Sequence, residues 1–147
     1  MTLNMKTLAE NRRAKFDYDL KDSLVAGLSL SGPEVKSVKA GNVSLTGSYV
    51  TVSAQGAMLV NCHIGPYKYA PNEKYDPTHS RQLLLNQKEI SGLLGKEKGL
   101  VIIPLEIFEG RRGWLKLKIG VGKARKKTDK REYIKKRETQ KEIRAAL

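Results

Sequence analysis

Cysteine is nearly absent from this chain of 147 residues, since Cys62 is the only one. A single cysteine excludes a disulfide within the chain, so we expect a reducing, cytoplasmic location. Long apolar runs are also absent: the longest, residues 100–105, contains Pro104 and is far too short to cross a bilayer. The N-terminus has no apolar segment typical of a secretion signal. We therefore predict no membrane segment.

Residues for metal binding and catalysis are equally scarce. The chain has two histidines beside its one cysteine, and no spacing brings three or four ligands together. Cys62 and His63 point to opposite faces of a strand, so they cannot form a nucleophile and base pair. His79 could meet Cys62 in space, but a buried structural cysteine is the expectation. No glycine-rich phosphate loop follows a strand. We predict neither an enzyme nor a cofactor or metal site.

Positive charge is what the chain has in excess. Its 28 Lys and Arg residues outnumber 15 Asp and Glu, for a formal net charge of +13. Residues 123–147 hold 11 basic and four acidic residues, which is more than half of that net charge. Such an excess favours polyanions, and nucleic acid is the first candidate. The alternative is that these side chains only keep the protein soluble.

The apolar pattern predicts short strands with small helices between them. A strand over residues 24–30 leads into a short helix that begins at Ser31 or Gly32, carries Pro33 in its first position and ends at Gly41. Two antiparallel strands flank a turn at 54–56. Residues 66–81 hold three prolines and three tyrosines without a period, which is typical of a functional or disordered loop.

A second helix and a hairpin complete the predicted elements. Asn86 and Glu89 have capping-box spacing, and Gly95 ends that helix, with Ile90, Leu93 and Leu94 facing the core. The hairpin turns over 109–113. Its second strand alternates inward Leu115, Leu117, Ile119 and Val121 with outward Trp114, Lys116 and Lys118.

This pattern predicts a mainly β protein, an OB-like antiparallel barrel with short helices. We expect a frayed or variable segment at residues 1–10, an RNA-binding barrel at 11–121 and a basic tail at 122–147. In the tail, Asp129 can cap a helix, but Ile134 and Ile143 fall on opposite sides of it. We predict a tail that is disordered in the free protein and orders on a polyanion.

Three places could bind nucleic acid. The first is the outward strand face of Trp114, Lys116 and Lys118, whose aromatic ring and cations suit base stacking and phosphate contact; an ordinary solvated face is the alternative. The second is the 66–81 loop, which suits unpaired bases unless its tyrosines fold back on the barrel. That loop carries Tyr67, Tyr69 and Tyr75 beside Lys68, Lys74, His79 and Arg81. A weaker third cluster is Arg12, Arg13 and Lys15.

An ordered set of motifs resembles the SsrA-binding protein family, also called small protein B, the partner of transfer-messenger RNA (tmRNA). The matching stretches are NRRA at 11–14, GPEVKSVKAG at 32–41, SYV at 48–50, DPTHSRQLLLNQKEI at 76–90 and KIGVGKARKKTDKRE at 118–132. Phe16, Val25 and Thr128 depart from the residues common in the family, so no family role is carried over to them.

The resemblance implies ribosome rescue by trans-translation. The barrel would bind the tRNA-like domain of tmRNA, enter the empty decoding site with elongation factor Tu, and lay its tail in the mRNA channel. An exposed barrel with a tail gives no reason to expect a dimer, so we expect a monomer. A generic OB-type binder of single-stranded or ribosomal RNA is the alternative. The implied barrel residues for tmRNA are Asn11, Arg12, Arg13, Glu34, Lys36, Ser37, Asp76 and Arg81. The implied ribosome-facing residues of the tail are Lys123, Lys126, Lys127, Asp129, Lys130, Arg131, Ile134, Lys135 and Arg137.

Overall fold

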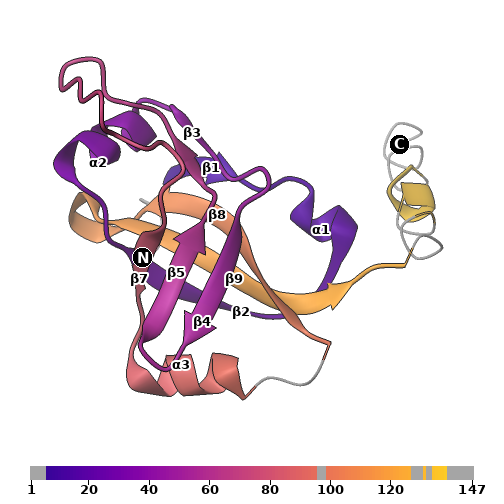
Figure 1. Cartoon of the computed structure of the whole chain (residues 1–147). Helices are drawn as coiled ribbons and strands as arrows, with labels where there is room; N and C mark the ends of the chain where they lie inside the picture. Colours follow the sequence, from indigo (N-terminus) through magenta and orange to yellow (C-terminus); the bar gives the residue numbers. More distant parts are fainter. Residues whose placement is uncertain (1–5, 96–98, 127–130, 132–133, 139–147) are drawn as a thin grey trace.

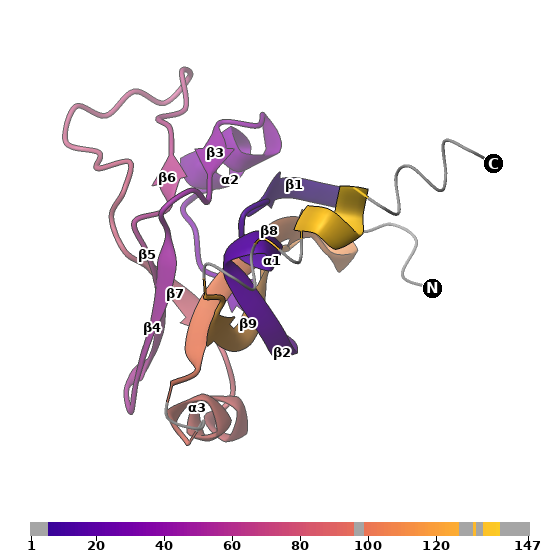
Figure 2. The ribbon, with the colours of Figure 1, turned by 90° about the vertical axis from the view of Figure 1, so that its right-hand side faces the viewer.

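Seven antiparallel strands form one curved sheet, with short helices at its ends (Figures 1 and 2). The structure is a computed structural model that describes residues 6–95, 99–126, 131 and 134–138. The strands are β1 Lys6–Glu10, β2 Tyr18–Leu28, β3 Val43–Ser44, β4 Tyr49–Ser53, β5 Gly56–Val60, β6 His63–Ile64, β7 Arg81–Leu84, β8 Val101–Glu109 and β9 Leu115–Ala124. The helices are α1 Ala14–Asp17, α2 Gly32–Lys39, α3 Gln87–Leu94 and a 3-10 turn at Arg111–Gly113.

The order of the strands agrees with the predicted OB-like barrel. The large sheet runs β1-β8-β9-β2-β7-β5-β4, and β3 pairs with β6 beside it. The sheet curls so far that its edge strand β4 contacts β8. No hydrogen-bonded ladder joins these two strands in the described part of the chain. The architecture is therefore mainly β and antiparallel, with an open seam between β4 and β8.

Alternation along the strands places the core inside this curved sheet. Leu115, Leu117, Ile119 and Val121 of β9 are buried as predicted, and the first three belong to one core cluster with Ile107 from β8. Burying one such side chain contributes about 1.5–3 kcal/mol relative to leaving it in water. The hydrophobic face of β9 is therefore a main reason why the sheet curls around a single core.

Both predicted helix starts are confirmed, and one core residue is corrected. Ser31 caps α2 in a capping box with Glu34, and Asn86 caps α3 in the same way with Glu89. In α3, Ile90 and Leu93 are buried but Leu94 is 51% exposed. The prediction for Leu94 was wrong because the core touches only one narrow stripe of this short helix.

The sheet extends beyond the limits predicted for the barrel at both ends. Residues 6–10 form β1 instead of a frayed segment, since their backbone pairs with β8. Strand β9 continues past Val121 to Ala124, which pairs with Tyr18 of β2. The described barrel therefore spans residues 6–124.

The basic tail is described only in part. Residues 131 and 134–138 are helical and exposed, and the latter stand apart from the sheet at the right of Figure 1. The predicted cap at Asp129 lies outside the described residues. No helix in the described part of the chain is both long and apolar enough to cross a membrane.

Candidate nucleic-acid interface

One outer face of the sheet crosses β7, β2 and β9. Side chains paired directly across a ladder lie on the same side of a sheet. Val25 pairs with Lys118, and Gly27 pairs with Lys116. Gly27 also pairs with Leu84 on its other side. The outward orientation predicted for the β9 lysines is thus confirmed, and two apolar residues from other strands join them.

Apolar and aromatic groups are unusually accessible on this face. Trp114 stands two positions before Lys116 in extended backbone and is 70% exposed, while Leu84 is 57% and Val25 44% exposed. We call Val25, Leu84, Trp114, Lys116 and Lys118 the outer sheet face. Exposed aromatic and apolar groups beside cations are typical of surfaces that stack bases and contact phosphates.

Leu84 was not predicted to lie on this face. Three consecutive leucines follow Gln82 in "RQLLL", so the sequence does not show which of them face the core and which face outward. In the structure, Arg81 and Leu83 are buried while Gln82 and Leu84 are exposed. The strand does alternate between buried and exposed residues, but a charged residue at a buried position made this alternation hard to recognise in the sequence.

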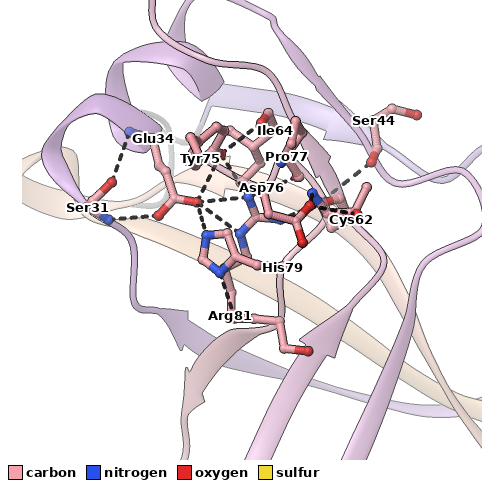
Figure 3. Close-up of polar contacts among 12 residues, drawn as sticks. Ser31, Glu34, Ser44, Cys62, Ile64, Tyr75, Asp76, Pro77, His79 and Arg81 are labelled. Atoms are coloured by element: carbon pink, nitrogen blue, oxygen red, sulfur yellow. Dashed lines mark hydrogen bonds and ion pairs between the residues drawn. The ribbon is translucent and has the colours of Figure 1, made fainter. Parts of the chain in front are cut away.

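A buried ion pair lies at the other end of β7 (Figure 3). Glu34 of α2 and Arg81 of β7 are only 5% and 1% exposed. Arg81 Nε and Nη2 lie 2.9 and 2.8 Å from Glu34 Oε2. The guanidinium also donates to the backbone oxygens of Cys62 and Pro77. Removing one partner of such a pair leaves a buried charge without compensation, which destabilises strongly.

Two residues of the 66–80 loop complete this cluster. The Tyr75 hydroxyl accepts from Arg81 Nη2 at 2.9 Å and lies 2.8 Å from the Ile64 carbonyl oxygen. His79 Nε2 lies 2.9 Å from Glu34 Oε2. We call Glu34, Tyr75, His79 and Arg81 the loop clamp. It ties α2, β7 and the end of the loop together, although its members are up to 47 positions apart in the chain.

The electrostatics of the clamp favour an ionised Glu34. Burial opposes the charge, but the hydrogen bond from the Ser31 backbone and the bonds from Arg81 and His79 outweigh it, so the pKa of Glu34 is lowered to about 2. Burial and the Glu34 charge raise the pKa of Tyr75. Glu34 and Arg81 were both candidates for RNA contact. Their side chains bind protein groups here, and this geometry supports a positioning role.

The other barrel candidates are spread over two further places. Lys36 and Asp76 are exposed near the clamp, whereas Ser37 is buried and its hydroxyl has no hydrogen-bond partner within the described residues. Asp76 accepts bonds from the backbone and hydroxyl of Thr78, and these bonds lower the pKa of Asp76.

Asn11, Arg12 and Arg13 lie away from both the outer sheet face and the clamp. They line a groove of about 800 Å³ along the open seam, together with Tyr49 and Val101. Asn11 is held there by a bond from its amide to the Pro104 carbonyl oxygen. The structure thus does not bring all predicted barrel residues into one site.

The candidates for catalysis do not converge. Cys62 is fully buried, its thiol donates to the Ser44 carbonyl oxygen, and burial raises its pKa to about 11. His79 belongs to the clamp instead. Within the described ranges, no group of three His, Cys, Asp or Glu residues is placed to hold a metal ion.

The tail candidates begin inside the sheet. Lys123 belongs to β9, and Lys126 follows it at the surface. Arg131, Ile134, Lys135 and Arg137 are exposed helical residues. Lys127, Asp129 and Lys130 lie outside the described residues. Arg125 donates from its backbone to the Asp17 carbonyl oxygen and from Nε to the Lys15 carbonyl oxygen, which fixes the point where the tail leaves the barrel.

Comparisons with known proteins agree over nearly the whole chain. A family model described as "SmpB protein" matches residues 8–147. The SsrA-binding protein of Anoxybacillus flavithermus is 43% identical over 144 residues, covering 97% of this chain and 93% of that relative. The SsrA-binding protein of Coprothermobacter proteolyticus is 46% identical over 143 residues, covering 95% of each.

A solved structure has the same fold. It is described as "tmRNA-SmpB: a journey to the center of the bacterial ribosome", and one of its chains is 37% identical to this one, with a TM-score of 0.66. The match covers 85% of this chain and 92% of that chain.

Proposed function

This chain belongs to the SmpB protein family, and from that premise we propose that it binds tmRNA and acts with it in trans-translation on the ribosome. In this reaction a ribosome stalled on an incomplete message is released and its unfinished polypeptide is tagged for degradation. The chain contributes by binding RNA and not by catalysis. Its place of action is the cytoplasm.

The barrel binds the tRNA-like domain of tmRNA in this proposal. The outer sheet face supports it, because Trp114 and Leu84 offer exposed flat or apolar surface while Lys116 and Lys118 offer cations. The loop clamp fixes the C-terminal end of the 66–80 loop through Tyr75 and His79, which lowers the entropy lost when that end binds RNA. Asp76 belongs to that loop, and Lys36 is an exposed residue of α2.

The tail contacts the ribosome. Its exposed cations suit a path lined by ribosomal RNA, in the decoding site and the mRNA channel. Elongation factor Tu reaches the complex through the tmRNA, and the protein acts as a monomer. Asn11, Arg12 and Arg13 on the seam groove remain candidates for RNA contact beyond the outer sheet face.

The full-length match to the SmpB family carries this proposal, since charge alone would suit any polyanion. The direct test compares binding to the tRNA-like fragment of tmRNA with binding to an unstructured RNA of equal length at matched salt. We expect the fragment to bind at least about tenfold more tightly. Similar affinities for both would favour a generic single-strand binder and overturn the proposal.

A further inference from the structure

A small pocket lies between the N-terminal end of α2 and the 66–80 loop. Its volume is about 220 Å³, below the range of pockets that take drug-sized ligands. Its lining comes from both sides: Ser31, Pro33 and Glu34 from the helix, and Gly65, Pro66, Tyr67, Ala70, Asn72 and Tyr75 from the loop. No residue of this pocket belongs to the outer sheet face.

Two residues of the loop clamp, Glu34 and Tyr75, form one wall of this pocket. Glu34 and Tyr75 line it and also bind Arg81, which is almost fully buried. The wall formed by Glu34 and Tyr75 is therefore held in place by contacts within the protein. The charge of Glu34 faces Arg81 at 2.8 Å, so a nearby anion does not meet an uncompensated carboxylate.

The remaining lining suits a flat ring, and two lysines, Lys68 and Lys74, adjoin lining residues in the chain without lining the pocket themselves. Tyr67 and two prolines supply apolar faces. The Tyr67 ring meets the Tyr69 ring edge-on at 5.3 Å between centroids, and Lys68 Nζ lies 4.7 Å from the Tyr69 centroid. Lys74 stands beside Tyr75 in the chain and is exposed. Aromatic rings next to cations are how proteins hold an unpaired base and its phosphate.

We infer that this pocket binds one unpaired nucleobase of the RNA, stacked on Tyr67, with the phosphates of that nucleotide beside Lys68 and Lys74. The inference rests on the proposed function, because it names a contact within the same RNA complex. The small volume of about 220 Å³ suits a single nucleobase. The pocket would thus add a base contact to the surface contacts of the outer sheet face.

Three variants test the pocket against its surroundings. Tyr67→Ala should weaken binding to the tRNA-like fragment about tenfold or more, because stacking on one aromatic ring is lost. Tyr67→Phe keeps the ring and should bind within about threefold of the wild type. Tyr69→Ala is the matched comparison: it removes an equal ring that contacts Tyr67 edge-on but does not line the pocket, so its loss should be smaller than that of Tyr67→Ala. Thermal unfolding of each variant checks that the fold persists.

The decisive measurement combines Tyr67→Ala with RNA fragments that lack one base at each unpaired position in turn. At the occupied position, the base-free RNA should weaken wild-type binding but cause no further loss in Tyr67→Ala. If every position adds its full effect to Tyr67→Ala, or if Tyr69→Ala loses as much as Tyr67→Ala, the pocket does not hold a base. The preference of the wild-type protein for the tRNA-like fragment over unstructured RNA is measured separately. That preference tests the proposed function, and it would remain even if the pocket holds no base.

Discussion

Glu34 should make the stability of this protein depend on acidic pH. Its pKa is lowered from 4.5 to about 2 in the folded state, so the folded protein favours the ionised carboxylate. That stabilisation is complete above about pH 5 and is lost as the pH falls toward 2, a loss of up to about 3 kcal/mol. Urea unfolding at pH 7 and at pH 3 should show about 2 kcal/mol of this loss, and the Glu34→Gln protein should not show that contribution.

A matched control separates the buried carboxylate from acid effects elsewhere. Glu109 pairs with Lys39 at 3.5 Å, and both side chains are partly exposed. Glu109→Gln should therefore change stability by less than about 1 kcal/mol at pH 7, whereas Glu34→Gln leaves Arg81 buried without its anion and should lose about 3 kcal/mol or more. Equal losses in the two variants would contradict the role assigned to the clamp.

The capping signals of α2 and α3 were predicted correctly from the sequence, but the loop clamp was not predicted. Ser31 and Pro33 mark the start of α2 because capping depends on neighbours a few positions away. Glu34 and Arg81 meet only after the chain has folded, 47 positions apart, and each looks like a surface charge in the sequence. Their burial, and the exposure of Leu84 on the same short strand, depend on tertiary packing.

Gly122 gives a sharp test of the β2–β9 ladder. A Cβ at this position would overlap the carbonyl oxygen of Asp19 and lie 2.9 Å from Leu20 Cα, next to the irregularity between Leu20 and Asp22. Backbone cannot move aside cheaply, so Gly122→Ala should destabilise the protein by about 2 kcal/mol or more. The glycine that matched the tail motif of the family therefore has a structural reason inside the sheet.

Gly92 is the control for that substitution. It lies in α3, and a Cβ there would meet nothing within 4 Å. Gly92→Ala should stabilise the protein by up to about 1 kcal/mol through helix propensity. Chemical unfolding of both variants checks the pair, and a Gly122→Ala protein as stable as Gly92→Ala would show that the close approach of β2 and β9 is wrong.

Strands with a strong internal pattern were predictable, and those that depend on a distant partner were not. The alternation in β9 is visible in ten residues, so its face and the hairpin before it were placed correctly. Strand β1 has only five residues, and its partner β8 lies about a hundred positions later. Pairing across such a separation leaves little trace in the local sequence, because β1 is stabilised by its hydrogen bonds to β8 and not by the strand propensity of its own residues.

The uneven charge of the chain supports the proposed division of work between barrel and tail. Residues 127–147 carry eight basic and four acidic residues, and the barrel keeps most of the remaining positive charge. Strand β9 ends at Ala124, and Arg125 donates hydrogen bonds to the carbonyl oxygens of Asp17 and Lys15. A chain that ends at Lys126 therefore keeps all of β9 and both of these bonds. A chain ending at Val121 would lose three pairs of the β2–β9 ladder.

We therefore predict that truncation after Lys126 leaves binding to the tRNA-like fragment within about threefold of the full chain, with the same salt dependence, because its phosphate contacts lie on the barrel. Tagging on stalled ribosomes should be abolished. A full-length chain with a scrambled tail of identical composition is the matched control: if it supports tagging, the tail acts through charge alone and its sequence is not read. If truncation also removes fragment binding, the tail takes part in the first recognition step, and the division between barrel and tail fails.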